Sequence, residues 1–141
     1  MLAKIQQDLS PTNTQLVAVS KTKPNSAIQE LYDQGQRIFG ENRVQELVEK
    51  EQALPRDIQW HLIGHLQRNK VKYIAAFVAL IHSVDSLRLL EEINKQGRKH
   101  ERIIKVLLQF HISEETTKFG LSLAEAEALL SSAAFLAMEN I

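Results

Sequence analysis

The strongest constraint in this sequence is a series of strand-like runs at regular spacing. Each run is short and rich in apolar and β-branched residues, and successive runs begin roughly 20–25 residues apart, the length of one strand, one helix and two tight turns. The expected strands cover residues 16–20, 37–40, 58–64, 78–85 and 103–111. This spacing predicts a chain built from consecutive strand–helix units.

Helical patterns with start and stop signals fill the intervals between the runs. Pro24 and Asn25 open one helix, and Gly35 closes it. Ser122 and Glu125 have the spacing of a capping box, in which each side chain bonds the backbone amide of the other residue. After a short amphipathic helix at the N-terminus, the expected helices cover residues 25–35, 44–54, 67–76, 86–96 and 122–131. Strands that alternate with single helices predict a parallel sheet with right-handed crossovers.

Two α/β architectures share this local pattern. A doubly wound open sheet of five strands would be complete within the 141 residues. A (β/α)₈ barrel typically needs about 250 residues, so only about five of its units fit here. Length alone therefore favours the open sheet. The last residues, AFLAMENI, have the pattern of an approach to a sixth strand.

Composition limits the chemistry that the chain can perform. The lack of cysteine excludes disulfides, thiolate metal sites and cysteine nucleophiles, and it is typical of a cytoplasmic protein. The 17 basic residues balance 17 acidic ones, which argues against a nucleic-acid partner. No apolar stretch is long enough to span a membrane, and the histidines are too scattered for a recognised metal site. We expect a single cytoplasmic domain over residues 1–141.

Lys21 is the most informative polar residue at a strand end, where both architectures place their functional surface. It shares a strand face with Val17 and Val19, so it follows a row of apolar side chains on that face. Partial burial there would lower the pKa of its amine and suit Schiff-base chemistry with an aldehyde. The alternative is a solvated loop lysine beside Lys23, which the charge pattern alone favours.

His61 lies inside the third expected strand, on the same face as Gln59 and Ile63. This arrangement predicts a polar-lined interior. The alternative is a core histidine whose ring bonds a neighbouring backbone group. The segment after the first strand, SKTKPN, contains no glycine, so the glycine-rich loops that bind dinucleotides or nucleoside triphosphates are not predicted.

Segments at the expected strand ends form a recognisable series. They are AVSKTKP at 18–24, FGENRVQE at 39–46, WHLIGHLQRNK at 60–70, HSVD at 82–85 and EETTKFG at 114–120. In this order and spacing they resemble the pyridoxal-phosphate homeostasis proteins, which are single-domain relatives of the alanine racemase barrel. The resemblance covers nearly the whole chain, and it rests on collinear segments rather than on any single motif.

The resemblance implies a (β/α)₈ TIM barrel that holds pyridoxal 5′-phosphate (PLP), with about the first five βα units present here. PLP would form a Schiff base with Lys21, and Lys23 would be a second lysine for transient handling of the cofactor. Asn42 and His61 would face the cofactor ring. Family members are carriers or regulators of intracellular PLP without robust catalytic turnover, and PLP-dependent apoenzymes are the partners that this role implies.

Two departures from the family pattern bear on this role. His111 stands where many relatives have Asn. The family's phosphate-binding residues, a Ser and an Arg–Gly segment late in the barrel, have no counterpart in residues 1–141. The sequence therefore predicts a chain truncated after its fifth unit that retains PLP weakly. A PLP-dependent racemase-like enzyme and a non-enzymatic five-stranded α/β binding module are the alternative functions.

Self-association is the first testable prediction. A barrel of about five units has two unpaired parallel edges, near its first and last strands, and such edges pair readily with another chain. We expect the chain of 141 residues to dimerise or aggregate. Small-angle scattering over a concentration series would show this behaviour, and a monodisperse monomer with cooperative unfolding would contradict it.

Overall fold

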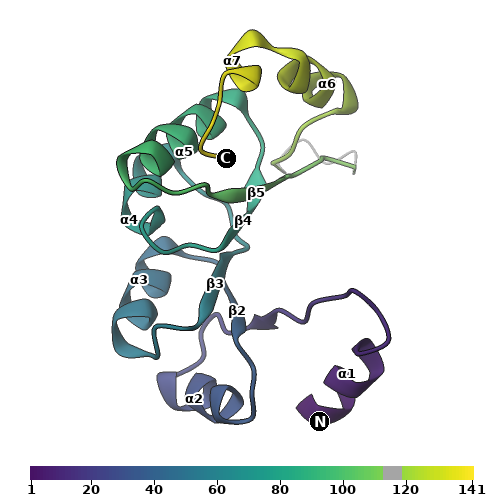
Figure 1. Ribbon diagram of the computed structural model, residues 1–141, viewed down its shortest axis with the longest axis vertical. Helices are drawn as coiled ribbons and strands as arrows, with labels where there is room; N and C mark the ends of the chain where they lie inside the picture. The colour runs from purple at the N-terminus through teal and green to yellow at the C-terminus, as the bar shows by residue number, and fades with distance from the viewer. Residues whose placement is uncertain (113–118) are drawn as a thin grey trace.

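The computed structural model describes residues 1–112 and 119–141, and its centre is one parallel sheet (Figure 1). The strands are β1 (Ala18–Val19), β2 (Ile38–Glu41), β3 (Gln59–Leu62), β4 (Leu80–Val84) and β5 (Lys105–Leu108). Each strand coincides with one of the expected runs, and β2 extends one residue beyond its run. Most of the segment EETTKFG lies outside the described residues, which resume at Phe119.

The helices follow the expected order along the chain. They are α1 (Leu2–Leu9), α2 (Asn25–Asp33), α3 (Val44–Ala53), α4 (Val71–Ile74), α5 (Leu87–Lys99), α6 (Leu123–Ser131) and α7 (Ala133–Leu136). The capping box of Ser122 and Glu125 is present at the start of α6, as predicted. In the part of the chain that the structure describes, no helix combines the length and the apolar character that crossing a membrane requires.

The helix expected over residues 67–76 is shorter and less regular than predicted. A 3₁₀ turn, η1 (Arg68–Lys70), comes first, and α4 then adds four residues. Carbonyl groups just beyond α4 are bonded by Arg102, whose guanidinium nitrogens lie 2.6 Å from the Ala75 oxygen and 2.9 Å from the Val78 oxygen. A side chain from a distant part of the sequence thus supplies the cap that the local sequence lacks.

The order of the strands decides between the two architectures. Neighbours in the sheet are neighbours in the chain, β1-β2-β3-β4-β5, and every adjacent pair is parallel. Each crossover therefore adds a strand to the same edge, and α2 to α5 lie on one side of the sheet (Figure 1). A doubly wound sheet reverses its direction and carries helices on both sides. The open-sheet expectation is wrong, and the βα units of a barrel are confirmed.

The hydrophobic core lies between the convex face of the sheet and the helices. Phe39, Trp60 and Ile81 come from three adjacent strands, and each is at most 2% exposed. They form one buried cluster with Leu47 of α3 and Leu90 of α5. Because side chains alternate along a strand, the sequence neighbours of these residues face the concave side.

The end of the chain returns to the sheet beside β5 (Figure 1). The Asn140 carbonyl accepts a hydrogen bond from the Ile104 backbone N–H at 3.0 Å, and the Asn140 side chain donates to the Arg102 carbonyl at 3.0 Å. Gly97 permits this approach, since a Cβ there would lie 2.7 Å from the Asn140 carbonyl oxygen. The expected approach to a sixth strand is confined to the last residues, because residues 133–136 form α7.

Buried helix positions should carry the stability of this core. Leu90→Ala removes a fully buried side chain, so we expect the free energy of unfolding to fall by about 2–5 kcal/mol. The matched control is Leu130→Ala in α6, where the leucine is 45% exposed and the expected loss is below about 1 kcal/mol. Urea unfolding followed by circular dichroism measures both losses. Equal losses in the two variants would contradict the assigned core.

Candidate functional site

The concave face of the sheet is lined by residues at matching heights on adjacent strands. Val19 pairs with Gly40, and Gly40 pairs with His61, so these residues form a row across β1, β2 and β3. A Cβ at Gly40 would lie 3.1 Å from Cγ1 of Val17 and 3.2 Å from Cδ1 of Ile63, which places both side chains on this face. Gly40 thus allows the side chains of Val17 and Ile63 to pack against the backbone at the centre of the row. Val19 is 53% exposed, because α2 to α5 cover the opposite face.

His61 is buried on this face and pairs with a second histidine. Its Nδ1 lies 2.9 Å from Nε2 of His82, and the ring centroids are 5.1 Å apart. Burial lowers the pKa of His61 to about 4, with His82 as the second cause, and burial also lowers the pKa of His82. The pair is therefore neutral near pH 7, with one N–H shared between the rings. The alternative of a histidine bonded to a backbone group is wrong, since the partner is an imidazole.

Lys21 and Lys23 lie in the loop that follows β1, at the carboxyl edge of the sheet. The Ser20 N–H donates to the Gly40 carbonyl at 3.0 Å and continues the pairing with β2 up to the residue before Lys21. The Lys23 N–H donates to the Ser20 carbonyl at 3.0 Å and closes the turn. Between the lysines, Thr22 has a φ of +63°, in the left-handed region. Both lysines are exposed, so the partial burial expected for Lys21 is not found in the described structure.

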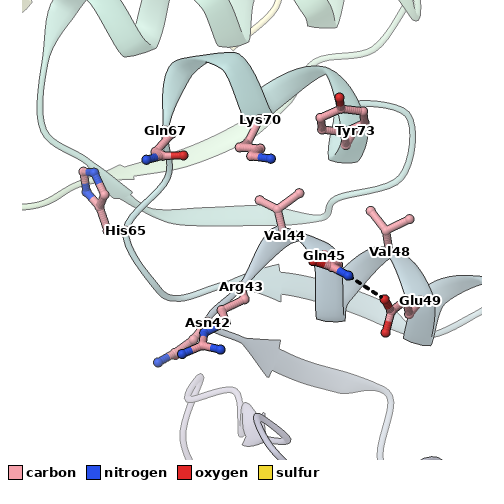
Figure 2. A pocket seen from close by; sticks show the side chains of 10 residues that line it. All are labelled: Asn42, Arg43, Val44, Gln45, Val48, Glu49, His65, Gln67, Lys70 and Tyr73. Carbon is pink, nitrogen blue, oxygen red and sulfur yellow. Dashed lines mark hydrogen bonds between the residues drawn. The ribbon is translucent and has the colours of Figure 1, made fainter.

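Asn42 follows β2 at the same edge of the sheet. Its backbone packs closely on Gly64, where a Cβ would lie 2.3 Å from the Asn42 carbonyl oxygen. Asn42 also borders a cleft of about 640 Å³ between α3 and the η1–α4 segment. Figure 2 shows Val44 and Val48 of α3 facing Tyr73 of α4 across this cleft. The other predicted site residues do not line it, so the cleft is distinct from the concave face.

The predicted site residues are distributed over three adjacent strands and their loops. Gly40 is the register partner of His61, and Asn42 follows Gly40 by two residues, just beyond the end of β2. His61 therefore lies further from the carboxyl edge of the sheet than Asn42 does. His82, which the sequence analysis did not assign to the site, lies two residues beyond Leu80, another register partner of His61. The HSVD segment was the available signal for His82. Among the described residues, no three carboxylate or imidazole groups are arranged to hold a metal ion.

A buried ionic cluster between α3 and the end of β2 was also missed by sequence reasoning. The ammonium of Lys50 in α3 lies 2.6 Å from a carboxylate oxygen of Glu41 and 2.6 Å from one of Glu46. The side chains of Lys50 and Glu41 are 6% and 0% exposed. The four-residue spacing of Glu46 and Lys50 on a helix was a visible signal. The bond to Glu41 depends on the packing of α3 over β2, which local sequence does not reveal.

Residues on either side of the range 113–118 contact each other. The His111 N–H donates to the Leu121 carbonyl at 2.9 Å, and a Cβ at Gly120 would lie 2.6 Å from the His111 nitrogen. Phe119 stacks on the ring of His65 with a centroid separation of 3.7 Å and an interplanar angle of 13°. The segments WHLIGHLQRNK and EETTKFG therefore contact each other through these two rings.

Known proteins resemble this chain over nearly its whole length. The family model described as "Alanine racemase, N-terminal domain" matches residues 2–140. The pyridoxal phosphate homeostasis proteins of Aquifex aeolicus and Escherichia coli are 45% and 43% identical to it over 106 and 131 residues. These matches cover 74% and 90% of this chain, and 46% and 56% of those proteins. The chain thus spans about half the length of the curated relatives it matches.

Solved structures give the same assignment. PipY of Synechococcus elongatus, determined without PLP, superposes with a TM-score of 0.89 at 38% identity, covering 99% of this chain and 64% of PipY. The structure of PipY with PLP bound has a TM-score of 0.83 at 41% identity, covering 92% of this chain and 60% of PipY. The resemblance inferred from the five segments is confirmed, and so is the alanine racemase-type barrel fold.

The histidine pair should make stability depend on pH. His61 has a pKa near 6.5 when unfolded and about 4 when folded, so the unfolded chain binds more protons between these values. This group therefore leaves the free energy of unfolding unchanged above pH 6.5 and lowers it as the pH falls toward 4, by at most about 1.4 kcal/mol per pH unit. Urea unfolding at a series of pH values measures the slope.

The variant His61→Gln should have a shallower slope than the unmodified chain over the same pH range. His100→Gln, at the end of α5, is the matched control and should keep the original slope. An unchanged slope in His61→Gln would show that the buried pair does not govern the pH dependence.

Proposed function

Since the chain belongs to the family of the alanine racemase N-terminal domain, we propose that it binds PLP and serves intracellular PLP homeostasis. The relatives from A. aeolicus and E. coli are named for that role, and PipY has been determined with PLP bound. One observation carries the proposal for this chain. An exposed lysine, Lys21, stands at the carboxyl end of β1, beside a concave face that α2 to α5 leave uncovered.

The residues of the concave face fit an aromatic aldehyde. The side chains of Val17 and Ile63, which pack over Gly40, give this face apolar surface. The neutral pair of His61 and His82 offers imidazole nitrogens without a positive charge that would repel a protonated pyridine ring. Bound PLP would supply an electrophilic aldehyde and a ring that withdraws electrons.

Lys21 is the residue that we assign to covalent capture. The neutral form of its amine would bond the aldehyde carbon of PLP, with the aldehyde oxygen leaving as water. Asn42 and His61 would contact the ring, and Lys23, two residues along the same loop, would take part in transient handling of the cofactor. Support for these roles comes from their common edge of the sheet and from the resemblance of the segments that contain them.

We assign this chain to storage and delivery of PLP in the cytoplasm, with PLP-dependent apoenzymes as recipients and without robust turnover. The names of the homeostasis proteins support this role. A racemase-like activity is the second candidate, because the matching family model is that of alanine racemase. Incubation with L-alanine and PLP separates the two, since measurable formation of D-alanine would favour the enzyme.

Covalent capture is tested by mixing the protein with PLP and recording the visible absorption of the Schiff base. We expect a band in the unmodified chain that is lost in Lys21→Arg, which keeps the charge but cannot form the bond. Lys23→Arg is the matched control and should retain most of the band. Borohydride reduction and peptide mass spectrometry identify the modified lysine. A band unchanged in Lys21→Arg would overturn the assignment.

A further inference from the structure

The ammonium of Lys50 bonds three oxygen atoms and reaches the loop that carries Lys21. It donates to Glu41 Oε1 at 2.6 Å, to Glu46 Oε1 at 2.6 Å and to the Ser20 carbonyl at 2.8 Å. An ammonium has three N–H donors, so its hydrogen-bonding capacity is fully used. Lys50 therefore links α3 to the end of β2 and to the residue before Lys21.

The residue after Lys21 is held by the same cluster. The Thr22 N–H donates to Glu46 Oε1 at 2.7 Å, the oxygen that also accepts from Lys50. The bond from Lys50 is the largest cause that lowers the pKa of Glu46, so this acceptor is charged at neutral pH. Lys21 thus lies between two residues whose backbones are anchored to α3.

The anchor holds Thr22 in a conformation that this residue seldom adopts by itself. Its φ of +63° lies in the left-handed region, which is unfavourable for a β-branched side chain. Such a residue keeps this conformation only where its surroundings enforce it. The turn bond from the Lys23 N–H to the Ser20 carbonyl at 3.0 Å supports it from within the loop. The bond from the Thr22 N–H to Glu46 supports it from outside the loop. Without the bond to Glu46, the turn bond alone would hold the backbone at Thr22, and the direction of the neighbouring Lys21 side chain would be less fixed.

Stability alone is a poor explanation for the cluster. A buried ion pair costs desolvation energy, and well-packed apolar residues commonly replace such pairs without loss of stability. Apolar residues could not fix the backbone geometry here, because they offer no acceptor for the Thr22 N–H and no donor for the Ser20 carbonyl.

We propose that Glu46, held by Lys50, is a positioning residue for Lys21. It fixes the backbone at Thr22 so that the Lys21 side chain leaves the loop toward the concave face. The inference rests on the proposed function of Lys21 as the residue that captures PLP.

The decisive variant is Glu46→Ala, which removes the anchor of Thr22 and leaves the bonds of Lys50 to Glu41 and Ser20 in place. The matched control is Glu49→Ala, a change of the same type on α3, where the carboxylate accepts a hydrogen bond from the exposed Gln45 side chain at 3.1 Å. Glu46→Gln keeps an acceptor for the Thr22 N–H and provides a conservative rescue. Urea unfolding establishes that each variant is folded.

Two measurements without PLP report on the anchor directly. Hydrogen exchange of the Thr22 amide should accelerate on the order of tenfold in Glu46→Ala, as expected for loss of one bond to a charged acceptor. The rate of reductive methylation of Lys21 by formaldehyde, relative to that of Lys4, should also change. Glu49→Ala should match the unmodified chain in both, and Glu46→Gln should lie close to it.

With PLP, Glu46→Ala should slow formation of the Schiff base on the order of tenfold, the same factor as loss of the anchoring bond. Adding Thr22→Gly should restore most of this loss, because glycine adopts positive φ without strain. A purely structural loss would not be restored in this way. Exchange and capture rates in Glu46→Ala equal to those of the unmodified chain would overturn the proposal, and so would a failure of Thr22→Gly to restore the rate of capture.

Different results would contradict the positioning role of Glu46 and the proposed function of Lys21. If the unmodified chain forms no adduct with PLP at Lys21, the proposed function is wrong. Amide exchange at Thr22 and methylation at Lys21 then still decide whether Glu46 sets the geometry of the loop.

Discussion

Burial of one face of a parallel sheet under its crossover helices is the constraint on which the other features depend. Removal of apolar side chains such as Trp60 and Ile81 from water provides the driving force. Because side chains alternate along each strand, that burial also determines which residues face the concave side, including Gly40 and His61. Parallel strands end at one edge, so the loop that carries Lys21 lies there as well. The chemistry proposed for the concave face therefore follows from packing on the opposite face.

Charge is divided between the two faces in a way that suits their surroundings. The concave face holds an imidazole pair whose lowered pKa values keep it neutral. The convex side holds Lys50, whose Nζ donates to carboxylate oxygens of Glu41 and Glu46 and to the Ser20 carbonyl. Neutral groups line the space where a ligand would enter, and charged groups lie where the backbone needs strong anchors.

Features of the fold that depend on nearby residues were predictable from the sequence. Features that depend on tertiary contacts were not. The capping box of Ser122 and Glu125 is defined by residues three positions apart, and it was predicted correctly. The end of α4 depends on Arg102, 24 to 27 residues away, and the predicted helix was accordingly too long. Strand order has no local signature, and chain length alone pointed to the wrong architecture. The ordered segments indicated the barrel because they reflect the whole fold.

The candidate site shows the same division. The sequence placed Lys21 and Asn42 at strand ends and His61 inside a strand, and the structure has them after β1, after β2 and within β3. It did not reveal the exposure of Lys21, which depends on what covers the loop. The partner of His61 is 21 residues away, and it was identifiable only from the pairing of β3 with β4. The Glu46–Lys50 spacing was visible on a helix, but its contact with the lysine loop required the packing of α3.

The consecutive order of the strands also bears on how the chain acquires its shape. Each strand pairs with the next one in sequence, and the cluster around Lys50 joins positions that are at most 30 residues apart. Contacts of short sequence separation lose little entropy on closure and form quickly. The portion from β1 to α3 is therefore able to assemble during synthesis, before the later units leave the ribosome. The loop that carries Lys21 would then be folded before β4 and β5 join the sheet.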